Sequence, residues 1–198
     1  VRSIVTSPFG DYICKKYNVT MLDCLTGFKW IAAVEDDFEK TGEYNYIFGL
    51  EESYGYKVEK EVMDKDGVSA AAMCAEMILY WRSQGKGLLE RLDELWKEYG
   101  YFEDRAISQN FPEQTGQQTM KNMMASMRNN PPATLCGEKV IKVRDLLNDD
   151  KLPKSNVLQF YLESGTIVSA RPSGTEPKIK FYINSMVPAG NGSDAWIS

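Results

Sequence analysis

One segment near the carboxyl end of the chain carries the residue types that bind a phosphate group. Residues 170–178 read Ala-Arg-Pro-Ser-Gly-Thr-Glu-Pro-Lys. Arg171 offers a bidentate guanidinium, Ser173 and Thr175 offer hydroxyl groups, and Gly174 offers a backbone N–H that an anion can approach closely. An ordinary polar turn has the same composition, so this pattern by itself leaves both interpretations open.

The chain contains no histidine, which removes several classes of chemistry. Histidine is the usual acid/base group at neutral pH and the commonest metal ligand, so serine–histidine–aspartate, cysteine–histidine and histidine–zinc sites are excluded within this chain. The four cysteines lie far apart and form no Cys-x-x-Cys pair, which predicts reduced thiols instead of a zinc site or a disulfide framework. Lysines, carboxylates and hydroxyls remain for chemistry.

The charge balance and the apolar pattern exclude two kinds of partner. With 23 Lys and Arg against 28 Asp and Glu, the net charge is −5, so no general basic surface is available for a nucleic acid. The longest apolar segment, residues 70–81, is too short to span a bilayer and is interrupted by Glu76. No signal-peptide pattern stands at the amino end. We expect a folded, cytoplasmic protein that binds neither nucleic acid nor membrane.

Strands alternate with helices in the first part of the chain. We predict strands at residues 2–6, 19–25 and 44–48, and helices at residues 8–17 and 28–40. Ser7 is the expected N-cap of the first helix, with Pro8 at its first helical position. Strands separated by helices predict a parallel or mixed sheet.

Two further helices are predicted before residue 100. Asp66 is a natural N-cap, and residues 69–83 are apolar on nearly every face, which is typical of a helix packed between layers. A second helix places Leu88, Leu92 and further apolar residues on one stripe, and Gly100 ends it. We therefore predict two domains, at residues 1–99 and 100–198.

The second predicted domain has an antiparallel α+β pattern. A strand at residues 101–111 ends at Pro112, and a methionine-rich helix at residues 113–128 has the spacing of a packed core. Further strands are predicted at residues 138–143, 157–162, 166–171 and 178–184. Residues 163–165 read as a tight hairpin turn. The pattern ends after Asn184, and we expect a loop-like tail.

Four segments together resemble the α-D-phosphohexomutase family. They are residues 25–29 (Leu-Thr-Gly-Phe-Lys), 49–55 (Gly-Leu-Glu-Glu-Ser-Tyr-Gly), 65–67 (Lys-Asp-Gly) and 170–178. The resemblance covers about residues 1–184 and is to phosphoglucomutases and phosphomannomutases, particularly the phosphoglucomutase-2-like branch. It implies the third and fourth domains of such an enzyme. The implied fold is an α/β mixed-sheet domain followed by an α+β domain with an antiparallel, TATA-binding-protein-like sheet.

The resemblance also implies roles for particular residues. Glu51 and Ser53 match the sugar contacts, and Lys29 matches a lysine near the reacting groups that could act as an acid/base or an electrostatic partner. The phosphate-binding residues would be Arg171, Ser173, Gly174 and Thr175. Other residues of these segments have simpler interpretations: Glu52 as a structural or solvated neighbour, Tyr54 and Tyr56 as aromatics that pack the loop instead of sugar platforms, and Lys57, Lys60 and Lys65 as solvated.

The departures from the family pattern define what is expected of this chain. It contains neither the Thr-Ala-Ser-His-Asn-Pro-type phosphoserine loop nor the Asp-Gly-Asp-x-Asp-Arg metal loop, and Leu50 stands where many relatives have glycine. Counterparts of the active-site histidines and of the closing helix are not evident. We expect a part of a longer enzyme, most simply a phosphoglucomutase, that holds hexose phosphate recognition but no metal site.

That expectation leaves the remaining components of the reaction to other domains of the same polypeptide. Mg²⁺ and hexose 1,6-bisphosphate would serve the full-length enzyme, together with its amino-terminal domains. Two other interpretations stay open: a stand-alone, non-catalytic sugar-phosphate-binding module, and a structural domain with degenerate loops. The choice among glucose, mannose and pentose phosphates stays open as well.

Overall fold

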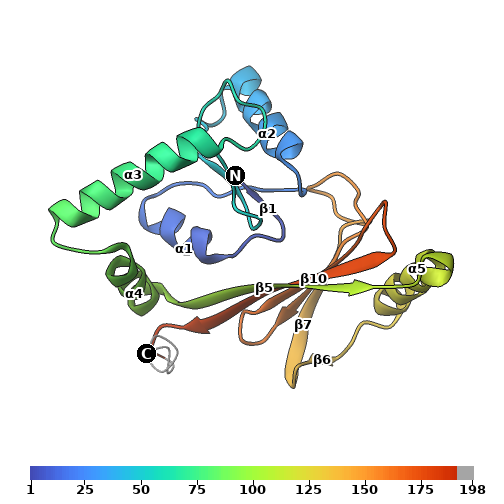
Figure 1. Ribbon diagram of the computed structural model, residues 1–198. Helices are drawn as coiled ribbons and strands as arrows, with labels where there is room; N and C mark the ends of the chain where they lie inside the picture. Colours follow the sequence, from blue (N-terminus) through green and yellow to red (C-terminus); the bar gives the residue numbers. More distant parts are fainter. Residues whose placement is uncertain (191–198) are drawn as a thin grey trace. The chain divides into compact units, whose positions relative to one another are not determined.

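The computed structural model describes residues 1–190, which divide into two compact units (Figure 1). Among these residues, one unit contains Val1–Tyr101 and residues 188–190, and the other contains Phe102–Val187. No helix within residues 1–190 is both long and apolar enough to cross a membrane. Whether residues 1–99 and 100–198 are independently folding domains stays a prediction.

The first unit is built on a four-stranded mixed sheet. Its strands are β1 (Arg2–Ser3), β2 (Asp23–Cys24), β3 (Gly49–Glu51) and β4 (Gly55–Lys57), in the order β2-β1-β3-β4. β2 and β3 run parallel to β1, whereas β4 runs antiparallel to β3. The predicted mixed sheet is therefore confirmed, with shorter strands than the sequence indicates.

The strand predicted at residues 44–48 is wrong, because the chain enters the sheet only at Gly49. The aromatic residues of this segment pack with their side chains instead. Tyr44 lies against Phe38, with ring centroids 5.2 Å apart, and Phe48 stacks on Tyr56 at 5.9 Å. The β-propensity of aromatic residues reflects such packing, so it does not require backbone pairing.

Four helices belong to the first unit: α1 (Phe9–Lys16), α2 (Phe28–Thr41), α3 (Gly67–Ser83) and α4 (Leu88–Tyr99). The predicted cap of α3 is confirmed, because the Asp66 carboxylate accepts a hydrogen bond from the Val68 N–H at 2.9 Å. At α1 the prediction is off by one position, since Pro8 itself occupies the N-cap and the Phe9 N–H donates to the Ser7 hydroxyl at 3.4 Å.

α3 is not the helix packed between layers that its apolar sequence predicts. None of its residues is buried within the described part of the chain, and Val68 is 81% exposed. The helix contacts β4 and α4, but strands of two or three residues offer little sheet surface to cover it. The core of this unit instead lies between the sheet and α2, at Cys24, Phe28 and Ile31.

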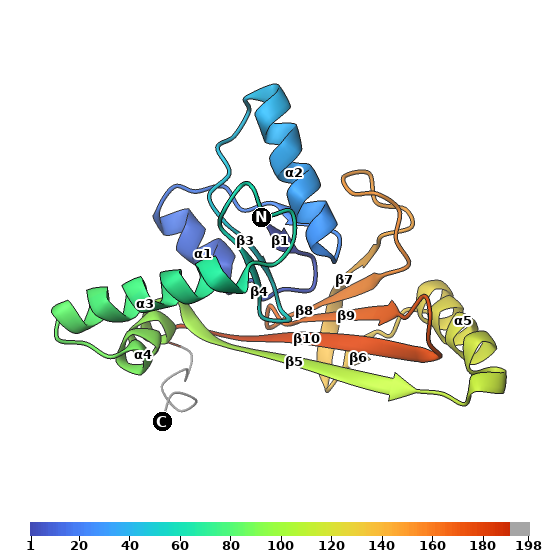
Figure 2. The ribbon, with the colours of Figure 1, turned by 45° about the horizontal axis from the view of Figure 1, so that its top comes forward.

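The second unit is an antiparallel sheet with one long helix, as Figure 2 shows. Its elements are β5 (Gly100–Asn110), α5 (Glu113–Asn129), β6 (Thr134–Leu135), β7 (Glu138–Asp145), β8 (Leu158–Leu162), β9 (Ile167–Pro172) and β10 (Lys178–Pro188). The strand order is β5-β10-β9-β8-β7-β6, and the neighbours from β6 to β10 pair antiparallel. The predicted antiparallel α+β pattern is confirmed.

The methionine-rich helix forms the core that its spacing predicts. Met120 and Met124 of α5 are buried against Leu158, Phe160 and neighbouring residues of one sheet face. At the other end of the unit, β10 continues four residues past the predicted end, to Pro188. The rest of the predicted tail, from residue 191, lies outside the described residues.

Candidate functional site

The phosphate-loop candidate connects β9 to β10 and is folded by its own hydroxyl group. The Ser173 hydroxyl oxygen accepts hydrogen bonds from the backbone N–H groups of Thr175, at 3.4 Å, and Glu176, at 3.2 Å. The Ser173 N–H donates to the Lys178 carbonyl at 2.8 Å and closes the loop at its base. Nothing lies within 4 Å of the position where Gly174 would carry a Cβ atom. The loop is therefore fixed, with open space beside its glycine.

Two cations stand side by side at the base of this loop. Arg171 of β9 lies directly opposite Lys180 of β10 in the strand register. Both side chains are half-buried, and within residues 1–190 neither makes a hydrogen bond or an ion pair. Like charges placed opposite each other in a sheet repel. An anion bound here would relieve that repulsion.

The third cation of this loop is already paired. The Lys178 ammonium forms an ion pair with the Glu176 carboxylate. The hydrogen bond from Lys178 lowers the pKa of Glu176, and the charge of Lys180 contributes a smaller lowering. Lys180 therefore acts within electrostatic range of the loop. Lys180 was not among the predicted site residues, because its position opposite Arg171 depends on the register of β9 with β10.

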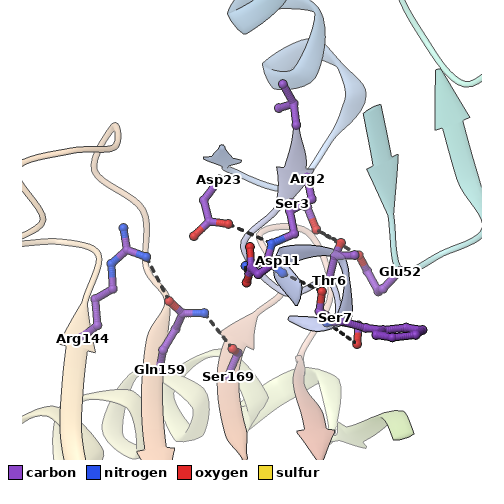
Figure 3. Close-up of polar contacts among 12 residues, drawn as sticks. Arg2, Ser3, Thr6, Ser7, Asp11, Asp23, Glu52, Arg144, Gln159 and Ser169 are labelled. Atoms are coloured by element: carbon purple, nitrogen blue, oxygen red, sulfur yellow. Dashed lines mark hydrogen bonds and ion pairs between the residues drawn. The ribbon is translucent and has the colours of Figure 1, made fainter. Parts of the chain in front are cut away.

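A row of polar side chains links three neighbouring strands on the same sheet face as Arg171. Arg144, Gln159 and Ser169 are register partners on β7, β8 and β9. Gln159 donates to the Ser169 hydroxyl at 3.1 Å and accepts from Arg144 at 3.3 Å, as Figure 3 shows. Because side chains alternate along a strand, Ser169 and Arg171 share one face of β9. The row fixes the strand that carries Arg171.

The outer end of this row is an ion pair. The Arg144 Nε atom donates to the Asp149 carboxylate at 2.6 Å. That hydrogen bond lowers the pKa of Asp149 to about 2. No residue of this row was predicted, because polar residues at alternate strand positions are typical of an ordinary solvent-facing side.

The sugar-loop candidate is the β3–β4 turn of the first unit, and internal hydrogen bonds hold its two carboxylates. The Gly27 N–H, just before α2, donates to Glu51 Oε1. The Ser3 hydroxyl donates to Glu52 at 3.1 Å and contacts the Thr6 hydroxyl at 2.8 Å (Figure 3). The structural interpretation of Glu52 is therefore confirmed, and Glu51 is oriented at the amino end of α2.

The residues at the tip of this turn are exposed. Ser53 is exposed, and Tyr54 has 88% of its surface open to solvent with a left-handed backbone, φ 60°. The prediction that both tyrosines pack the loop is confirmed for Tyr56, which stacks on Phe48, and wrong for Tyr54.

Three of the lysines considered in the first unit have exposed side chains. Lys29, in the first turn of α2, is exposed, with its ammonium 5.2 Å from the Trp30 ring centroid. Lys60 and Lys65 are exposed as predicted, although Lys60 pairs with Glu39 and Lys65 with Asp64.

The prediction that Lys57 is solvated is wrong. Its side chain is fully buried between β4 and α2, where the ammonium pairs with Glu35 and donates to the Glu59 carbonyl at 2.8 Å. The Tyr46 ring centroid lies 4.9 Å from the same ammonium. A buried lysine is stable only with such partners, and its charged partner, Glu35, lies 22 residues earlier in the sequence. Reading the sequence locally could therefore not identify it.

The predicted site residues thus fall into two groups. Lys29, Glu51 and Ser53 belong to the first unit, where Glu51 lies against the turn that precedes α2. Arg171, Ser173, Gly174 and Thr175 belong to the second unit and share one loop. Within residues 1–190, no group of three or more His, Cys, Asp or Glu side chains could hold a metal ion.

Comparison with known proteins identifies the class to which this fold belongs. Residues 1–99 match the family model described as phosphoglucomutase/phosphomannomutase, alpha/beta/alpha domain III. A superposition on the open form of parafusin, a phosphoglucomutase from Paramecium, covers 93% of this chain. Its TM-score is 0.68, and the sequence identity is 19%. That likeness covers 32% of the parafusin chain and concerns the fold.

Curated relatives extend the match over nearly the whole sequence. A probable phosphomannomutase from Haemophilus influenzae is 39% identical over 184 residues, and a phosphoglucomutase from Staphylococcus epidermidis is 34% identical over 195 residues. Each match covers 92% of this chain and 35% of the relative. The chain belongs to the phosphoglucomutase/phosphomannomutase family, and it spans about a third of the length of these relatives.

Proposed function

We propose that this chain is the substrate-recognition part of a phosphohexomutase of the phosphoglucomutase type. The complete enzyme would interconvert hexose 1-phosphate and hexose 6-phosphate through a bisphosphate intermediate. The observation that carries the proposal is that the Arg171 and Lys180 side chains face each other beside the Ser173 loop and make no ion pair within residues 1–190. Two half-buried cations in register attract an anion. Membership of the family supplies the identity of that anion, a sugar phosphate.

The phosphate would bind at the base of the β9–β10 loop. Arg171 would donate two parallel hydrogen bonds, which is the strongest geometry for a phosphate. Ser173, the Gly174 N–H and Thr175 would complete the contacts, and the open space beside Gly174 leaves room for the anion. Lys180 would add a second positive charge, matched to a phosphate that carries nearly two negative charges at neutral pH.

The sugar would bind at the β3–β4 turn. Glu51 is oriented by the Gly27 N–H, so its carboxylate can accept hydrogen bonds from adjacent sugar hydroxyls without first losing rotational freedom. Ser53 is exposed beside it and can donate or accept. Lys29, two residues after Gly27, would act as an acid/base or as an electrostatic partner of the transferring phosphate.

The family resemblance implies Mg²⁺, but within residues 1–190 no group of three or more His, Cys, Asp or Glu side chains could hold it. Metal binding and the phosphoserine belong in this proposal to other domains of the polypeptide, and the chain alone is expected to bind sugar phosphate without turning it over. Hexose 1,6-bisphosphate would be a ligand of the complete enzyme. The proposal includes a cytoplasmic location and a TATA-binding-protein-like second domain.

The test is binding of glucose 1-phosphate, followed by calorimetry or nuclear magnetic resonance titration. Arg171→Ala should weaken binding by about 10- to 150-fold, because a charge-assisted bidentate contact is worth about 1.5–3 kcal/mol. Arg105→Ala is the matched control, since this β5 side chain is 73% exposed and paired with Glu103. Equal effects of the two substitutions, or no binding by the unmodified chain, would contradict the proposal. Mannose and ribose phosphates tested in parallel address the choice of sugar.

A further inference from the structure

The tip of the β3–β4 turn carries a side chain that the fold does not use. Tyr54 is 88% exposed, the highest value among the large apolar side chains of residues 1–190. Its ring makes no ring contact there, and its hydroxyl makes no hydrogen bond within the same residues. Nothing in the packing of the first unit accounts for a tyrosine at this position.

The backbone of Tyr54 adds a second observation. Its φ of 60° lies in the left-handed region, which is unfavourable for a bulky side chain and which asparagine or glycine adopts more readily. Conformational preference alone favours one of these two residues at this position. The tyrosine therefore sits where its own conformational preference opposes it.

The neighbours of Tyr54 fix this conformation. On one side, the carboxylates of Glu51 and Glu52 accept hydrogen bonds from the Gly27 N–H and the Ser3 hydroxyl. On the other side, Gly55 lies so close to Phe28 that a Cβ atom would come within 2.5 Å of that ring. The turn thus presents the Tyr54 ring outward on a rigid support.

We propose that Tyr54 is a stacking platform for the apolar C–H face of the sugar ring, an inference that rests on the proposed function. Sugar rings combine hydroxyls at their rim with C–H groups on their faces, so a carboxylate, a hydroxyl and an aromatic ring on one turn match both parts. Glu51 and Ser53 provide the first two groups, and Tyr54 provides the third. An exposed, rigidly held tyrosine loses little conformational entropy on binding.

The experiment compares three variants by nuclear magnetic resonance titration with glucose 1-phosphate and, separately, with inorganic phosphate. Tyr54→Asn removes the ring and suits the left-handed backbone, Tyr54→Leu keeps an apolar side chain without a flat face, and Tyr54→Phe keeps the ring. Tyr17→Ala is the control, because Tyr17 is a 64% exposed tyrosine at the end of α1.

Tyr54→Asn and Tyr54→Leu should weaken glucose 1-phosphate binding by about 2- to 10-fold. Neither should change inorganic phosphate binding, and Tyr54→Phe and Tyr17→Ala should bind glucose 1-phosphate like the unmodified chain. Tyr54→Asn should also raise the thermal unfolding midpoint, by about 2–4 °C.

Three results would overturn the inference alone: unchanged sugar-phosphate binding in Tyr54→Asn and Tyr54→Leu, an equal loss in Tyr54→Phe, or an equal loss of inorganic phosphate binding. If the unmodified chain bound no sugar phosphate, the proposed function would fall together with the inference.

Discussion

The two candidate loops differ in how their charges are used. In the β3–β4 turn, both carboxylates accept hydrogen bonds from the protein, Glu51 from Gly27 and Glu52 from Ser3. At the base of the β9–β10 loop, the side chains of Arg171 and Lys180 make no hydrogen bond or ion pair within residues 1–190 and face each other in register. Charges bonded inside the protein contribute to stability, whereas unpaired like charges oppose it and favour a ligand. Removing an internally bonded charge beneath the first loop should therefore lower stability, whereas removing Arg171 or Lys180 should weaken phosphate binding without lowering stability.

The largest expected effect lies beneath the first loop, at the buried pair of Lys57 and Glu35. Lys57→Ala leaves the Glu35 carboxylate buried without its partner, which should lower the free energy of unfolding by about 3–5 kcal/mol. Denaturant unfolding of the chain measures this change. The double substitution Lys57→Met with Glu35→Leu should recover much of the loss, because it removes both charges. A loss below about 1 kcal/mol in Lys57→Ala would mean that the pair does not support β4.

A smaller effect is expected in the second unit, at the ion pair that ends the polar row beneath Arg171. The pKa of Asp149 is lowered to about 2, so its charge contributes stability above pH 4 or so. That contribution should be lost as the pH falls from about 4 to about 2. Asp149→Asn should therefore cost about 1 kcal/mol at pH 6, and this cost should shrink as the pH falls toward 2 and vanish below it.

Unfolding curves between pH 6 and pH 2 test this sign directly. Asp150→Asn is the control, because that neighbouring side chain is exposed. A difference between Asp149→Asn and the unmodified chain that is as large at pH 2 as at pH 6 would show that the carboxylate charge is not the cause.

The sequence predicts the second unit better than the first, for a physical reason. Its strands alternate between one covered face and one polar face, and a tight hairpin joins two of them, so the strand that carries Arg171 follows from local pattern. In the first unit the strands are two or three residues long, and contacts between distant segments decide the structure. The aromatic segment at 44–48 and the buried Lys57 depend on partners outside their own segments, and α3 is exposed because the short strands offer little surface to cover it. The roles of the site residues stay predictions.

The smallest expected effect addresses the second loop most directly, because it separates stability from binding at one position. Lys180→Gln removes one charge and keeps a polar side chain of similar length. Repulsion from Arg171 disappears, so the free energy of unfolding should rise by about 0.2–1 kcal/mol, and this gain should shrink as salt screens the charges. The same substitution should weaken inorganic phosphate binding by several-fold, because one of the two cations is lost.

Lys139→Gln is the matched control for this prediction, since it removes an exposed lysine from β7 of the same sheet. It should change neither quantity measurably. The opposite pattern for Lys180→Gln, a loss of stability with unchanged phosphate affinity, would mean that Lys180 stabilises β10 by packing. The proposed difference between the two loops would then be wrong, because Lys180 would contribute to stability as Glu51 and Glu52 do, and not to phosphate binding.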